Sequence, residues 1–175
     1  MPNGFSYSVK NIISGTFDYT RLCLNHYKRG RFHMLEIKQL HSIKEWKEAF
    51  PVIKQLRTHL DEESYLELVK EAMEKENYKM AALFDDETII AVTGYMPMTT
   101  LYNGKFIWVC DLVTDEKHRS KGHGKTLLSY IENWGIKYGF KIISLSSGLQ
   151  RKDAHRFYMD KMEYDQVSYV FLKKL

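Results

Sequence analysis

The segment at residues 119–124, with the sequence Arg-Ser-Lys-Gly-His-Gly, constrains the fold of this chain more than any other feature. An apolar stretch at residues 107–113 precedes it, and a stretch with a predicted buried stripe at helical spacing follows it. The stripe consists of Leu127, Leu128, Ile131, Trp134 and Tyr138. These patterns predict a strand, a turn and a helix in that order. Because the first N–H groups of a helix have no intrahelical acceptors and carry the positive end of the helix dipole, the turn is a predicted binding site for phosphate.

Glycines and basic residues in this turn support the phosphate interpretation. Gly122 and Gly124 lack a Cβ, so a phosphate can approach the backbone closely at both positions. Arg119, Lys121 and Lys125 add positive charge around the same turn. The turn therefore combines backbone donors, open space and basic side chains.

Two phosphate-binding patterns do not fit the turn. A P-loop that ends at Gly124 and Lys125 also needs a glycine five residues before Gly124, where this chain has Arg119. A dinucleotide-binding loop needs a third glycine three residues after Gly124, where this chain has Leu127. Both patterns fail at a position where glycine has a steric role.

A third pattern does fit. The turn resembles the pyrophosphate loop of the GNAT-type N-acetyltransferases, in which Arg or Gln is followed after two residues by Gly and after one more by Gly or Ala. Arg119, Gly122 and Gly124 occupy these positions. Residues 146–158 resemble the last conserved block of the same family, where a strand leads through a loop into a short helix that bears Ala154 and, four residues on, Tyr158. The resemblance covers residues 34–175.

The resemblance implies a single α/β domain of the GNAT type. Its sheet should be central, twisted and mixed but mostly antiparallel, with splayed central strands and flanking helices. A capping box at Ser42 and Glu45 begins a helix, which Pro51 should kink or break. The patterns predict strands at residues 35–40, 78–84, 88–96, 105–113, 142–146 and 164–172. Further helices are predicted at residues 61–76, from the turn at 119–124 to about residue 138, and around Tyr158.

Residues 1–33 are interpreted as an N-terminal extension of the domain at residues 34–175. They contain five basic residues and one acidic residue, and Met34 is followed at once by an alternating strand pattern. We expect Met34 to be the native start, with the preceding residues translated from an upstream start codon. The alternative is an ordered extension that pairs with the sheet or with a neighbouring subunit.

The composition argues against several classes of function. Hydrophobic residues make up 44% and charged residues 27% of the chain, which is typical of a globular domain, and no apolar run is long enough to span a membrane. The net charge of +4 arises from lysines spread among acidic residues, which argues against nucleic acid as a partner. Cys23 and Cys110 cannot make a disulfide framework, so a cytoplasmic location is expected. His123 and His155 belong to no metal-ligand constellation, and no metal is expected.

The resemblance implies transfer of an acetyl group from acetyl-CoA to a primary amine, by direct attack in a ternary complex. The splayed strands would be residues 107–113 and 142–146, and the backbone of Leu112 and Val113 would pair with the pantetheine arm of the co-substrate. The expected phosphate-binding residues are Arg119, Ser120, Lys121, Gly122, His123, Gly124, Lys125 and Arg151, the last where relatives commonly have Asn.

Two side chains are candidates for proton transfer. A tyrosine, with a reference pKa of about 10, can protonate a thiolate whose thiol pKa is near 8.5, and Tyr158 is the expected acid. The alternative role for Tyr158 is a core aromatic. Asp111, on the splayed strand, is the candidate base for the attacking amine. A structural hydrogen-bond acceptor is the alternative role for Asp111, and water can replace a dedicated base.

The acceptor stays open at this stage. A polyamine, an antibiotic amine, an amino acid or a protein amine would all fit, because the acceptor site is expected to come from the variable helices at residues 42–76 and the late strands. A non-catalytic acyl-CoA-binding sensor or interaction module is the alternative function. The resemblance also allows a homodimer.

Overall fold

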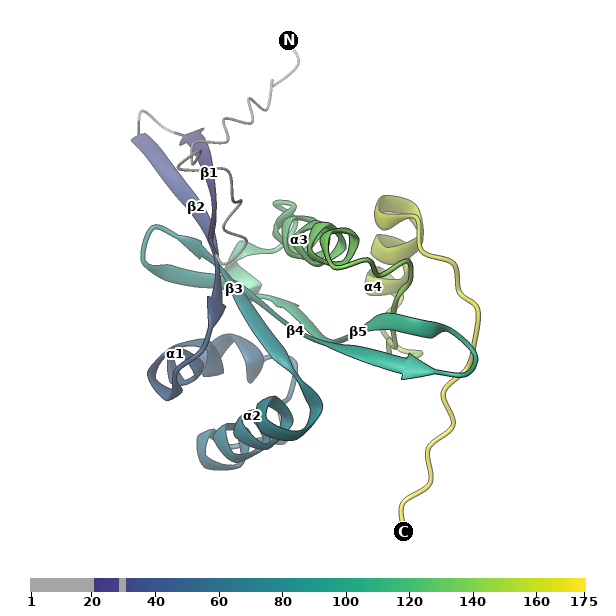
Figure 1. Ribbon diagram of the computed structural model, residues 1–175. Coiled ribbons are helices and arrows are strands. Elements are labelled where there is room, and N and C mark those ends of the chain that lie inside the picture. The colour runs from purple at the N-terminus through teal and green to yellow at the C-terminus, as the bar shows by residue number, and fades with distance from the viewer. Residues whose placement is uncertain (1–20, 29–30) are drawn as a thin grey trace.

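One twisted sheet of six strands runs through the computed structural model, which describes residues 21–28 and 31–175 (Figure 1). Neighbouring strands from β1 to β5 are antiparallel, whereas β5 and β6 are parallel. The prediction of a mixed, mostly antiparallel sheet is therefore confirmed. In spatial order the strands are β1 (Arg21–Lys28), β2 (Arg31–Leu40), β3 (Lys79–Asp85), β4 (Thr88–Thr100), β5 (Gly104–Thr114) and β6 (Ile143–Leu145).

The helices connect these strands. α1 and α2 lie between β2 and β3 in the chain, α3 makes the crossover between the parallel strands β5 and β6, and α4 follows β6. Within the described ranges, no helix is both long and apolar enough to cross a membrane. The helical segments are α1 (Ile43–Ile53), α2 (Glu62–Glu76), a 3-10 turn η1 (Glu116–His118), α3 (His123–Lys137), α4 (Lys152–Arg156) and a π-helical turn η2 (Phe157–Lys161).

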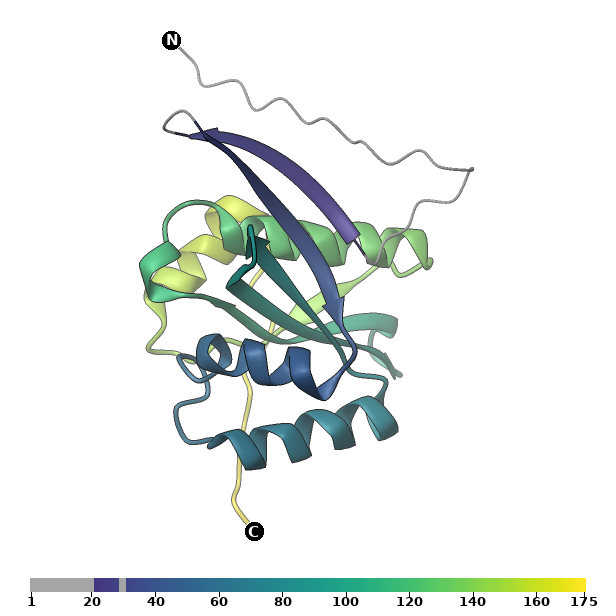
Figure 2. The ribbon, with the colours of Figure 1, turned by 90° about the vertical axis from the view of Figure 1, so that its left-hand side faces the viewer.

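Helices cover both faces of the sheet, with α1 and α2 on one face and α3 and α4 on the other (Figures 1 and 2). Alternate residues of β3 point to opposite faces. Ala81 and Leu83 belong to the core under α3, while Met80, Ala82 and Phe84 belong to the core under α1 and α2. Both faces of this strand are therefore buried, which explains its continuous apolar sequence.

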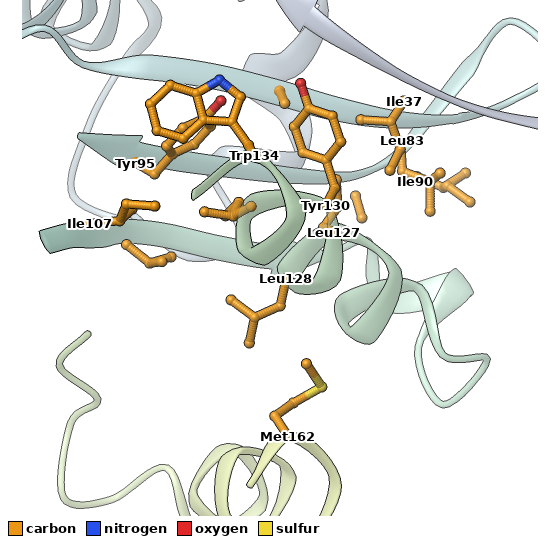
Figure 3. Packing of buried hydrophobic residues seen from close by; sticks show 14 residues of the cluster. Ile37, Leu83, Ile90, Tyr95, Ile107, Leu127, Leu128, Tyr130, Trp134 and Met162 are labelled. Carbon is orange, nitrogen blue, oxygen red and sulfur yellow. The ribbon is translucent and has the colours of Figure 1, made fainter. Parts of the chain in front are cut away.

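Figure 3 shows the core between α3 and the sheet. The apolar stripe predicted on this helix is confirmed at Leu127, Leu128, Ile131 and Trp134, all of which are buried. Tyr138, which the sequence also places in the stripe, is more than half exposed. It lies at the C-cap of α3 and packs beside the Trp134 ring, with 4.7 Å between the ring centroids.

The predicted start of α1 is confirmed, the predicted break at Pro51 is wrong, and a kink there stays a prediction. The Ser42 side chain accepts a hydrogen bond from the backbone N–H of Glu45, and the Glu45 carboxylate accepts one from the backbone N–H of Ser42. α1 continues through Pro51 and ends two residues later, at Ile53. Proline removes one backbone donor and crowds the preceding turn, but only two residues of α1 follow Pro51, so the helix ends there and is not divided into two helices.

Part of the N-terminal extension belongs to the sheet. β1 pairs along its whole length with β2, and β2 begins at Arg31 rather than at residue 35. The ordered extension is the alternative that this pairing supports. Residues 1–20 and 29–30 lie outside the described part of the chain, and a native start at Met34 stays a prediction.

The strand predicted at residues 164–172 is wrong. The chain from residue 163 onward forms neither helix nor strand, and in Figure 1 this yellow segment runs away from the helices to the C-terminus. Val167, Tyr169 and Phe171 are 73–93% exposed. β-branched and aromatic residues favour a strand only when a neighbouring strand pairs with them. The adjacent strand β6 is only three residues long and offers few backbone partners.

Candidate active site

β5 separates from β6 halfway along its length. Its residues Ile107, Trp108 and Val109 pair with β6, and the pairing ends there. From Cys110 to Thr114, β5 continues in contact with β4 alone among the described strands. The predicted splay of the two central strands is therefore present. The edge of β5 opposite β4, in the stretch that contains Leu112 and Val113, pairs with no other described strand.

A β-bulge marks the point of separation. Asp111 pairs with Gly94 of β4 and Val109 pairs with Tyr95, so Cys110 is an extra residue on β5. A bulge bends its strand and increases the local twist. The bend directs the end of β5 away from β6 and toward η1 and the start of α3.

α3 begins at the predicted phosphate-binding turn. Gly122 is its N-cap, with a φ of 87°, and Ser120 also has a positive φ, of 60°. The first backbone bond of the helix runs from the Thr126 N–H to the Gly122 carbonyl, 3.0 Å away. The N–H groups of residues 123–125 therefore precede the helical ladder, and the first turn contains no acidic residue. This helix start is suited to an anion.

Glycine occupies positions 122 and 124 of the turn for different structural reasons. A Cβ on Gly122 would meet no atom within 4 Å, so this position needs glycine for its positive φ. A Cβ on Gly124 would lie 3.6 Å from Cζ of Phe157 and 3.8 Å from Oγ1 of Thr114, which is ordinary contact. The turn therefore lies directly against the segment that carries Tyr158.

Basic side chains from the turn are tied to nearby carbonyl groups. Arg119 Nε donates to the carbonyl of Thr114 at 3.3 Å, and Lys121 Nζ donates to that of Lys117 at 3.2 Å. Both contacts are exposed, so both cations can turn to a phosphate.

The loop before the turn is fixed to the end of α1. The Gln55 amide donates to Oδ2 of Asp115 at 2.8 Å and accepts from the N–H of Glu116 at 2.9 Å. Hydrogen bonds from His118 and Gln55 lower the pKa of Asp115. The base of the phosphate-binding turn is therefore held in one position.

Tyr158 lies in η2, partly buried beside two aromatic rings. Its ring centroid is 5.3 Å from that of Phe157 and 6.0 Å from that of Tyr164. Burial raises the pKa of Tyr158 above its ordinary value, and the positive charge of Arg151 opposes this in part. The hydroxyl is therefore protonated at neutral pH, as a proton donor must be.

Asp111 lies in a network of hydrogen bonds on the α1–α2 side of the sheet. Its Oδ1 accepts from Arg57 at 2.8 Å, and its Oδ2 accepts from the Tyr78 hydroxyl at 3.0 Å. The Asp111 carbonyl accepts from Oγ1 of Thr93 at 2.8 Å. Sequence reasoning missed Arg57 and Tyr78, since neither belongs to a motif. The glycine inside β4, Gly94, was the one available signal, because a Cβ there would lie 1.8 Å from the Tyr78 hydroxyl.

The two histidines and Cys110 lie close to the proposed site in the chain. His123 is buried at the start of α3, and Nε2 of His155 lies 3.0 Å from the carbonyl of Gly148. No group of three or more metal-binding side chains occurs in the described part of the chain. Burial raises the pKa of the Cys110 thiol to about 12, which makes it a poor nucleophile.

The sequence matches known proteins along most of its length. Residues 40–164 match the family described as the Acetyltransferase (GNAT) family. Over 140 residues the chain is 47% identical to the uncharacterized N-acetyltransferase YhdJ of Bacillus subtilis (strain 168), and this stretch covers 80% of the chain and 99% of that protein.

Solved structures share the fold at low sequence identity. The aminoglycoside N-acetyltransferase AAC(6')-Iy, in complex with CoA, gives a TM-score of 0.71 at 14% identity, over 83% of this chain and 97% of that one. The ribosomal-protein-alanine N-acetyltransferase from Brucella melitensis biovar Abortus 2308 gives 0.64 at 16% identity, over 79% and 99%.

Proposed function

The chain belongs to the acetyltransferase (GNAT) family and is an N-acetyltransferase of this type, and we propose that it transfers an acetyl group from acetyl-CoA to a primary amine by direct attack in a ternary complex. One observation carries the proposal: the end of β5 has no partner on the β6 side among the described strands and is followed, after η1, by the start of α3, whose geometry suits an anion. A long ligand that ends in phosphates fits this arrangement.

Acetyl-CoA supplies a thioester, a strand-like pantetheine arm and a phosphate-rich end when it is bound. The backbone of Leu112 and Val113 would hydrogen-bond to the arm. The helix start at Gly122 would bind the pyrophosphate through its N–H groups, with charge from the neighbouring basic side chains. The proposed phosphate-binding residues are Arg119, Ser120, Lys121, Gly122, His123, Gly124, Lys125 and Arg151.

Tyr158 is the proposed acid. When the acceptor amine forms its bond to the acetyl carbon, the carbon–sulfur bond breaks and the departing sulfur takes up a proton. The Tyr158 hydroxyl, which is protonated at neutral pH, would donate that proton. Its segment packs against Gly124, which puts it beside the proposed phosphate site.

For Asp111, the contacts favour a different role from that of a base. Both of its carboxylate oxygens already accept hydrogen bonds, from Arg57 and Tyr78. We therefore propose that water removes the proton from the acceptor amine. The role of Asp111 as the base, which the sequence suggested, stays a prediction. Direct attack is consistent with the high pKa of the Cys110 thiol, which disfavours an acetylated cysteine.

We also propose a cytoplasmic homodimer. The apolar side chains of Val167, Tyr169 and Phe171 face water in the single chain, which favours burial against a partner. The exposed segment at residues 165–175 is therefore the proposed contact surface between two copies.

Release of free thiol from acetyl-CoA, measured against a panel of polyamines, aminoglycosides, amino acids and peptides, tests the function. Turnover with one class of amine would identify the acceptor. Binding of acetyl-CoA without thiol release for any amine would favour the acyl-CoA sensor.

A further inference from the structure

Arg57 connects the acceptor-side helices to the point where the central strands separate. It lies in the irregular segment between α1 and α2, outside both helices. Its Nε and Nη2 both lie 2.8 Å from Oδ1 of Asp111, and Nη2 also donates to the carbonyl of Cys110 at 2.8 Å. One guanidinium therefore binds two consecutive residues of β5.

The residues that Arg57 binds are those of the bulge. Cys110 is the extra residue of β5, and the last β5–β6 pair, Val109 with Leu145, immediately precedes it. An extra residue in a strand is left out of the ladder, so its carbonyl needs another donor. Arg57 supplies that donor at the position where β5 leaves β6.

The remaining contacts hold Asp111 from other directions. The Tyr78 hydroxyl donates to the second carboxylate oxygen, and Thr93 donates to the backbone carbonyl. The absence of a side chain on Gly94 leaves room for Tyr78. The Asp111 side chain is 14% exposed and that of Arg57 41% exposed, so water screens this ion pair less than it screens a surface pair.

We infer that Arg57 is a positioning residue that fixes the bulge at Cys110 and thereby sets the course of the free β5 edge at Leu112 and Val113. The inference rests on the proposed function, in which that edge pairs with the pantetheine arm. Arg57 itself touches no reacting atom. Its loss should weaken binding of the arm while the phosphate-binding turn, which Gln55 and Asp115 hold separately, keeps its affinity.

The test measures two ligands on the full chain and on Arg57→Met. Acetyl-CoA reports on the arm and the phosphates together, and 3′-phosphoadenosine 5′-diphosphate, used as a competitor, reports on the phosphates alone. Without the charge-assisted hydrogen bonds of Arg57, acetyl-CoA should bind about tenfold more weakly. The inhibition constant of the fragment should stay within about twofold of the wild-type value, because a change of that size is well under one hydrogen bond.

Lys47→Met is the matched control. Lys47 of α1 pairs with Glu62 of α2 at 3.6 Å, and both side chains are about half exposed. This variant also removes a cation from the α1–α2 region, but this cation links α1 to α2 and makes no ion pair with the described residues of β5. Its affinity for acetyl-CoA should equal that of the wild type.

Arg57→Lys covers the case in which Arg57→Met does not fold. Lysine keeps a charge for Asp111 but replaces the planar fork by a single ammonium, so acetyl-CoA should bind about threefold more weakly. Two results would overturn the inference about Arg57 but leave the proposed function intact. One is wild-type affinity for acetyl-CoA in the folded Arg57 variants, and the other is an equal loss of affinity for both ligands. Failure of the wild type to bind acetyl-CoA would instead remove the proposed function.

Discussion

Phe157 packs against the start of α3 at Gly124, where a Cβ would lie 3.6 Å from the Cζ atom of the ring. This contact joins the two parts of the proposed site, because Gly124 belongs to the phosphate-binding turn and Phe157 directly precedes Tyr158. The position of the proposed acid therefore depends on the helix that would hold the pyrophosphate.

The two glycines of the turn should respond differently to substitution. Gly122→Leu forces a side chain onto a residue with a φ of 87°, so the turn must change and binding of acetyl-CoA should be lost. Gly124→Ala adds only ordinary contacts and should change the dissociation constant by less than about threefold. Titration calorimetry of both folded variants makes the comparison. Equal affinity in the Gly122 variant and the wild type would contradict the assignment of the turn.

Tyr158→Phe should separate catalysis from binding. The ring and its packing against Phe157 and Tyr164 remain, while the proton donor is lost. We expect kcat to fall by about 100-fold, the lower range for general acid catalysis. The dissociation constant for acetyl-CoA should be unchanged. Steady-state kinetics and calorimetry on the same preparation check this, and unchanged kcat would return Tyr158 to the role of a core aromatic.

Much of the fold and part of the site could be predicted from the sequence, because these features are local. The capping box at Ser42, the strand before the turn and the glycine pattern up to Gly124 all depend on nearby residues. Arg57 could not be found this way, since its partner Asp111 is 54 positions away in the chain. The prediction of a strand at residues 164–172 failed for the same reason. A strand there needed a neighbouring strand, which the described fold does not supply.

Stability should fall at alkaline pH. Burial raises the pKa of Tyr78 and of Tyr95 above the value of about 10 expected in the unfolded chain. Above pH 10 the folded state therefore holds protons that the unfolded state has lost, so the free energy of unfolding decreases as the pH rises. Below pH 10 this contribution is complete and constant. Urea unfolding at pH 8, 9, 10 and 11 measures it, and equal stability at pH 9 and 11 would contradict the burial of these hydroxyl groups.

The exposed C-terminal segment should determine the oligomeric state. If residues 165–175 pack against a second copy, light scattering after size exclusion should give twice the mass of the chain. A chain that ends at Tyr164 should be monomeric, because Tyr164 packs on its own core while the residues after it are exposed. A monomeric full chain would remove the dimer from the proposal.

Titration of the purified full chain with acetyl-CoA and, in parallel, with ATP tests the central claim most directly. Both ligands carry a chain of phosphates on adenosine, but only acetyl-CoA has an arm that can pair with Leu112 and Val113 on the free edge of β5. The account predicts tight binding of acetyl-CoA and weak binding of ATP. No binding of acetyl-CoA, or equal binding of both ligands, would contradict it.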